Sequence, residues 1–113
     1  MAKTDFIQQS EIDVTQKIIE SLSNVCTRAI MFSIKNEAKD ATQIADELKI
    51  SLSTVYKALC NLEELALIVV KKFVISQEGK KIKLYQSRIG KVEISISNME
   101  PVLNLYPNNT SSS

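Results

Sequence analysis

Between Val14 and Leu65, apolar residues recur every three or four positions, which is the period of an α-helix. This pattern predicts four helices, which begin at Val14, near Val25, after Thr42 and at Leu52. Polar residues that can cap a helix precede each start, namely Asp13, Ser23 or Asn24, Thr42 and Ser51, and Gln16 has the spacing to complete a capping box with Asp13. Val14, Ile18, Leu22 and Val25 recur along one face of the first helix. In the later helices the residues expected to face inward are Val25, Cys26, Ala29, Ile30, Ser33, Ile44, Ala45, Leu48, Leu52, Val55, Leu59 and Leu62, whereas Arg28, Met31 and Lys35 are expected to face away.

Beyond Leu65 the period changes from 3.6 to two, which is typical of β-strands. One strand is predicted from Leu67 to Ile75 and its partner from Lys81 to Gln86, and Gly79 can supply the positive φ that the turn between them needs. A second pair is predicted at 92–97 and 102–105. We therefore divide the chain into an N-terminal arm at 1–12, a domain at 13–90, a hairpin extension at 91–106 and a disordered tail at 107–113.

The composition argues against an enzyme and against a metal site. The 113 residues include no histidine, so Ser-His-Asp and Cys-His catalysis and histidine-bound zinc are excluded. Cys26 and Cys60 are 34 positions apart, which is too far for a CxxC metal box; we expect Cys26 to pack in the core and Cys60 to face outward. We predict no catalysis, no metal and no cofactor. Since no signal peptide or membrane span is evident, we expect a cytoplasmic protein.

Positive charge is concentrated in one segment, although the net charge of the whole chain is only +1. Between Lys71 and Lys91 there are seven basic residues and a single acidic one, Glu78, so this segment carries +6. A concentrated basic strip attracts phosphate even in a protein of neutral composition.

Helix, short helix, tight turn, longer helix and basic hairpin is the element order of an α+β winged helix-turn-helix, here with a C-terminal β-hairpin extension. We call the hairpin at 71–85 the wing. In DNA-binding members the helix after the turn enters the major groove with its N-terminal end first. Ser53, Thr54 and Lys57 lie on the outward face of that helix and are small or basic enough to reach base edges.

A family resemblance supports this interpretation. The stretch TRAIMFSIKNEAKDATQIADELKISLSTVYKALCNLEELALI, residues 27–68, resembles the core of ArsR-type and MarR-type transcriptional regulators, especially archaeal ones. The resemblance extends over residues 23–90. It is carried by Thr27, Arg28, Ile44, Ala45, Leu48, the run Ser51–Val55, Leu59, Leu62, Leu65 and Ile68. Two features depart from these families: the paired cysteines of metal-sensing ArsR members are absent, and the chain ends in strands where MarR members have a long dimerising helix.

The resemblance implies a homodimer that binds a pseudo-palindromic site on double-stranded DNA and regulates transcription. The alternative is a winged-helix module that binds protein in a transcription or scaffold complex. The residues expected at the DNA are Thr42, Gln43, Ser51, Ser53, Thr54, Tyr56, Lys57, Asn61, Lys80 and Lys81. The N-terminal apolar residues exceed what one short helix needs, so a dimer interface is expected at Phe6, Ile7, Val14, Ile18 and Ile19, with packing inside the subunit as the alternative.

Overall fold

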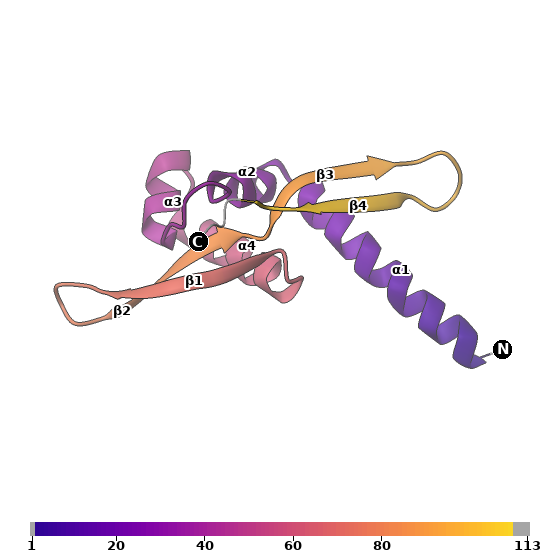
Figure 1. The fold of residues 1–113 in the computed structure, drawn as a ribbon, viewed down its shortest axis with the longest axis horizontal. Helices are drawn as coiled ribbons and strands as arrows, with labels where there is room; N and C mark the ends of the chain where they lie inside the picture. The colour runs from indigo at the N-terminus through magenta and orange to yellow at the C-terminus, as the bar shows by residue number, and fades with distance from the viewer. Residues whose placement is uncertain (1, 110–113) are drawn as a thin grey trace.

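The computed structural model describes residues 2–109, with side chains placed from Asp13 onward. It is an α+β winged helix-turn-helix with a second hairpin at its C-terminal side, as the sequence predicts (Figure 1). Its elements are α1 (Ala2–Ser23), α2 (Val25–Ser33), α3 (Ala41–Leu48), α4 (Leu52–Glu64), β1 (Ile68–Ile75), β2 (Lys81–Ser87), β3 (Ile89–Ser95) and β4 (Val102–Pro107).

The helix starts agree with the sequence at two positions and differ at two. Asn24 caps α2 by accepting from the amide of Thr27, and Ser51 caps α4. The cap expected at Thr42 is wrong, because Asp40 caps α3 and forms a capping box with Gln43. The cap expected at Asp13 is also wrong, because α1 is continuous from Ala2 and the first residues extend this helix and do not form a separate arm.

The core lies where α2, α3 and α4 meet the inner ends of α1, β1 and β2. Met31, expected to face solvent, is fully buried because α2 is packed against α1, α3, α4 and β2 and so has little free surface. Val25 and Leu52, expected to face inward, are 66% and 42% exposed, since each is the first residue of a helix whose burial begins further along.

Two left-handed residues end α3 and α4. Lys49 has φ 58° and lets the chain turn sharply between the two helices of the motif. Ala66 has φ 62° and follows α4 in a Schellman arrangement: the amide of Leu67 donates to the carbonyl of Leu62 at 2.9 Å, and the amide of Ala66 donates to that of Glu63 at 3.0 Å. Alanine thus occupies a conformation that favours glycine.

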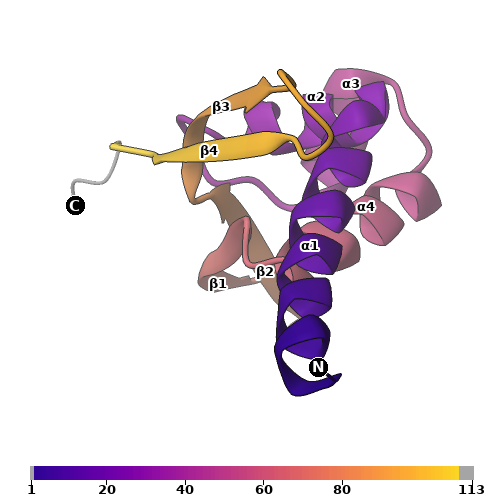
Figure 2. The ribbon, with the colours of Figure 1, turned by 90° about the vertical axis from the view of Figure 1, so that its right-hand side faces the viewer.

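The four strands form two separate antiparallel hairpins, β1–β2 and β3–β4. The first hairpin contains the wing at 71–85, and Gly79 takes φ 84° in its turn, as the sequence predicts. Only Arg88 separates β2 from β3, so one nearly continuous run of chain serves both hairpins. The hairpins extend toward opposite ends of the long axis, and α1 projects from the same end as β3–β4 (Figures 1 and 2).

The end of β4 is fastened to the body. The side-chain amide of Asn108 donates to the carbonyls of Lys35 at 2.7 Å and Ser87 at 2.9 Å, and its backbone amide donates to Arg88 at 2.8 Å. The expected disordered tail from Pro107 therefore starts too early, because β4 includes Pro107. Residues 110–113 of that tail lie outside the described residues. Within the described part, no helix has the length and apolar character to cross a bilayer.

Candidate nucleic-acid interface

The first half of α4 presents a polar face to solvent. Val55 is fully buried, while Ser53, Tyr56 and Lys57 around it are exposed, Tyr56 by 52%. The period of the helix causes this division, because Val55, Leu59 and two further apolar residues of α4 pack into the core and turn the intervening polar positions outward. The face expected to read DNA is therefore accessible.

A cluster of hydroxyl groups caps the start of α4. Ser51 Oγ accepts from the amide of Thr54 at 3.2 Å and donates to Thr54 Oγ1 at 2.8 Å, and Ser53 Oγ lies 3.4 Å from Ser51 Oγ. The cap satisfies the amide of Thr54 and leaves the preceding amides of the first turn, at Leu52 and Ser53, without an acceptor inside the helix. Exposed amides at a helix start favour an anion such as a phosphate oxygen.

The wing carries lysines on the face that turns toward α4. The register pairs Phe73 with Lys83 and Ile75 with Lys81, so these four side chains share one face, and Lys72 lies on the other. The ammonium of Lys81 lies 4.8 Å from the centre of the Phe73 ring, a cation–π distance that favours a defined side-chain position.

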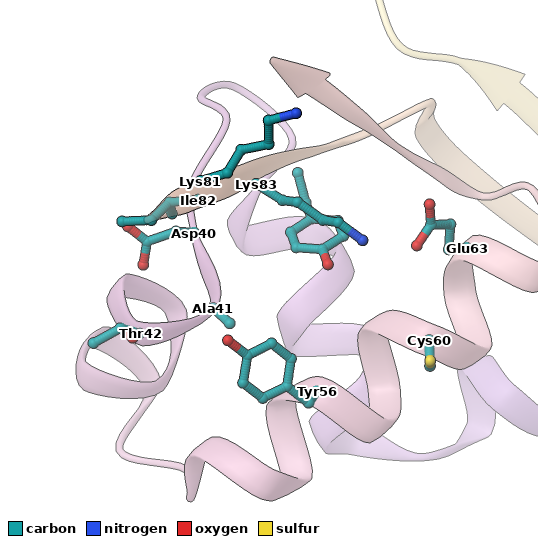
Figure 3. Close-up of a pocket in the computed structure, with 10 residues that line it drawn as sticks. Asp40, Ala41, Thr42, Tyr56, Cys60, Glu63, Lys81, Ile82 and Lys83 are labelled. Carbon is teal, nitrogen blue, oxygen red and sulfur yellow. The ribbon is translucent and has the colours of Figure 1, made fainter. Parts of the chain in front are cut away.

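A concavity of about 660 Å³ separates the wing from α4 (Figure 3). The hydroxyl of Tyr56 points toward the start of α3 on one side, and Lys81 and Lys83 come from the wing on the other. The lining residues are Asp40, Ala41, Thr42, Tyr56, Cys60, Glu63, Lys81, Ile82, Lys83 and Tyr85. Burial, with a further contribution from the Glu63 carboxylate, raises the pKa of the Tyr85 phenol, so this group is neutral at physiological pH.

A second hollow of about 500 Å³ lies between the start of α2 and α4 and includes Cys26, Thr54 and Lys57 in its lining. At its edge the amide of Asn61 donates to Ser21 Oγ at 2.7 Å. The side chain of Asn61, one of the expected DNA contacts, thus joins α4 to α1. Cys26 is half-buried here and not in the core, whereas Cys60 is exposed as expected.

The expected DNA-binding residues divide between the two hollows that border α4, with Thr54, Lys57 and Asn61 at the second one. Thr42, Tyr56 and Lys81 line the concavity, Lys57 is exposed on α4, and Lys80 is exposed in the wing turn. Gln43 is exposed, but its side chain also accepts from the amide of Asp40 in the capping box. Its capping role leaves Gln43 less suited than Thr42 to an outside ligand.

The expected DNA contacts did not include Lys83 and Tyr85, which line this concavity from β2. The signal for Lys83 was present, because the alternation through Lys81 and Ile82 puts Lys81 and Lys83 on the same face of a strand. Tyr85 had no such signal, since its place beside Glu63 depends on how the hairpin packs on α4.

Of the residues expected at a dimer interface, Val14 is 53% exposed and Ile19 is half-buried. Ile18 is only 6% exposed and belongs to the subunit's own core, which corrects its assignment. Phe6 and Ile7 lie in α1, and their side chains are outside those that the structure describes.

Comparisons with known proteins found similarity among solved structures alone. No protein-family model matches the chain, and no curated protein does. Among solved structures, two of a double mutant of ZitR from Lactococcus lactis are similar, each with a TM-score of 0.46. The first, in apo form, is 26% identical over 77% of this chain and 62% of its own; the second is 22% identical over 77% and 66%. The chain thus spans less than two thirds of the first ZitR chain. Its description as a winged helix rests on its own elements and packing.

Proposed function

We propose that this chain binds double-stranded DNA as a homodimer and regulates transcription, with α4 in the major groove and the wing on the phosphate backbone. In this proposal residues 13–90 are the DNA-binding unit. The observation that carries it is that Tyr56 of α4 and Lys81 and Lys83 of the wing line one concavity on the exposed side of the recognition helix.

The shape and chemistry of α4 suit a base-reading role. The major groove of B-DNA admits one α-helix, and hydroxyl and ammonium groups are among those that bond to base edges there. Ser53 and Lys57 are exposed near the N-terminal end of α4, which is the end that enters the groove in this fold. Because their neighbours Val55 and Leu59 are anchored in the core, the backbone that carries them is held in place.

The wing supplies the contacts that do not depend on sequence. Lys81 and Lys83 project from the strand face that borders α4, and Lys80 lies at the turn. Lysines so placed can neutralise phosphates beside the groove that α4 occupies. The absence of histidine from the sequence and the binding character of this surface favour a role in binding and not in catalysis.

The test is selection of bound duplexes from a random pool, followed by affinity measurements on the selected site at low and moderate salt. Lys57→Ala should weaken binding to the selected site by about 1–3 kcal/mol because a base or neighbouring phosphate loses its partner. Lys91→Ala, which removes an exposed charge from the other hairpin, is the matched control and should bind like the wild type.

Binding that is undetectable at both salt concentrations would refute the DNA-binding proposal and favour the protein-interaction module. Equal affinity of the Lys57→Ala variant and the wild type would remove Lys57 from the interface.

A further inference from the structure

The β3–β4 hairpin has one apolar face and one polar face. Its register pairs Val92 with Leu105 and Ile94 with Leu103, so these four side chains share a face. The other face carries Lys91, Glu93, Ser95, Asn104 and Tyr106, with Val102 as its one apolar aliphatic residue. There Tyr106 donates a hydrogen bond to Glu93 at 2.9 Å, and the Lys91 ammonium lies 5.1 Å from the Tyr106 ring. The polar face is thus satisfied within the hairpin itself, and the apolar face is not.

The burial of the apolar face decreases along the hairpin. Val92 and Leu105 at its base pack against the core of the subunit, and so does Leu103, the cross-strand partner of Ile94. On β3 the burial falls outward from Val92: Ile94 is 42% exposed, and Ile96 beyond it is 72% exposed. A two-stranded hairpin that projects from its domain is marginal by itself in water, so an apolar face at its outer end calls for a partner.

Helix α1 projects from the same end of the molecule as this hairpin (Figure 2). Val14, Ile18 and Leu22 follow one another at intervals of four along one side of α1. Ile18 and Leu22 are buried in the core, but Val14 is 53% exposed, so the apolar stripe continues past the edge of the subunit. Two separate elements therefore carry an apolar surface outward at the same end.

The whole chain exposes more surface than its size requires. Its accessible surface is 7738 Å², whereas a compact monomer of 12.6 kDa has roughly 6,200 Å². Its radius of gyration is 16.2 Å, against about 13 Å for a compact domain of 113 residues. The projecting elements, which are the wing, α1 and the β3–β4 hairpin, account for this extended shape (Figure 1). The surplus is roughly 1,500 Å²; the wing accounts for part of it, and a standard protein interface would take roughly 800 Å² per partner from the rest.

We propose that a second copy of this chain covers the apolar face of the β3–β4 hairpin, in a symmetric dimer whose interface continues onto Val14 of α1. A two-fold arrangement lets the same surface of each copy serve both, as most soluble homo-oligomers do. The wing points toward the opposite end of the long axis, so a dimer joined here leaves α4 and the wing of each copy accessible. This inference identifies the surface for the homodimer in the proposed function and rests on that part of it.

The experiment is sedimentation velocity of the full chain between about 1 and 100 μM, and the wild type should reach twice its 12.6 kDa. A variant with Ile94→Asp and Ile96→Asp should raise the dimer dissociation constant at least 100-fold. Ser95→Asp with Ser97→Asp is the matched control, because it adds the same charge to the same hairpin at exposed polar positions and should stay dimeric.

Circular dichroism of each variant reports folding. Ile96→Asp alone serves if the double variant unfolds, because Ile96 is 72% exposed in its own subunit. A wild type that is monomeric at 100 μM would overturn the inference, as would a folded double variant that stays dimeric. Dissociation by Val14→Asp but not by the hairpin variants would also overturn it, because the interface would then lie on α1 alone.

Binding of a nonspecific duplex at low salt separates this inference from the proposed function. A monomeric hairpin variant should retain such binding, since its wing and α4 are unchanged. A wild type that is dimeric and binds no DNA would refute the DNA-binding role and leave the interface in place.

Discussion

Replacing Lys81 and Lys83 together by alanine tests whether the wing grips the DNA backbone. Both lysines lie on the wing face that borders α4, and both line the concavity opposite Tyr56. Lys72 lies on the other face of the same hairpin. The two faces therefore offer a comparison within a single element.

The size of the effect follows from the number of phosphates that the lysines neutralise. If Lys57, Lys80, Lys81 and Lys83 each contact one phosphate, the slope of log affinity against log salt is about −3.6 for one protomer, and removal of two contacts leaves about −1.8. Between 50 and 200 mM salt the wild type then loses roughly 150-fold in affinity and the double variant roughly 12-fold. A dimer with both protomers on the DNA doubles each slope.

The assay is fluorescence anisotropy of a labelled duplex over at least four salt concentrations, with sequence preference measured in parallel by competition. Lys72→Ala should keep the slope of the wild type. An unchanged slope in the double variant would refute phosphate contact by this face, and an altered sequence preference would mean that the wing reads bases.

Three further predictions concern stability. Ala66→Gly should raise the free energy of unfolding by about 0.5–1 kcal/mol in urea titrations, because relief of the left-handed strain outweighs the added freedom of the unfolded chain; a decrease would contradict the strain assigned to Ala66. Asn108→Ala should lower the free energy of unfolding by about 1–3 kcal/mol, because the carbonyls of Lys35 and Ser87 each lose a donor. If the amides of β4 exchange no faster in this variant than in the wild type, Asn108 does not fasten this strand. The pKa of Tyr85 is raised above its ordinary value of 10.0, so the stability that it contributes is complete below pH 10 and is lost as the pH rises through the folded-state pKa; Tyr85→Phe should lessen the alkaline loss of thermal stability, and identical pH profiles would show that Tyr85 does not cause it.

Local periodicity was sufficient to predict the helices and strands of this fold. It did not predict which residues are buried where several elements pack together. The cap at Ser51 and the buried positions Val55, Leu59 and Leu62 followed from spacing alone, because α4 rests on the core by one side. Met31 was predicted wrongly because α2 has neighbours on most sides, which a single helical wheel does not show.

The candidate site divides in the same way. The exposure of Lys57 and Lys81 could be predicted, since it depends on one element and its period. The hydrogen bond of Asn61 was missed because its partner, Ser21, is 40 positions away on α1. Asp40 was overlooked as the cap of α3 although Gln43 follows at capping-box spacing. The first error needed the tertiary structure to correct it, whereas the second was visible in the sequence.

The single residue between β2 and β3 links the orientations of the two hairpins. Side chains alternate through this junction, with Ser87 and Ile89 buried and Arg88 between them exposed. Since neighbouring positions of a strand point to opposite sides, one residue inserted beside Arg88 would exchange the inner and outer faces of β3 relative to β2. The number of residues between β2 and β3 thus determines which face of the β3–β4 hairpin is apolar when the β1–β2 hairpin packs against α4. An insertion or deletion here would therefore change how the two hairpins are oriented relative to each other.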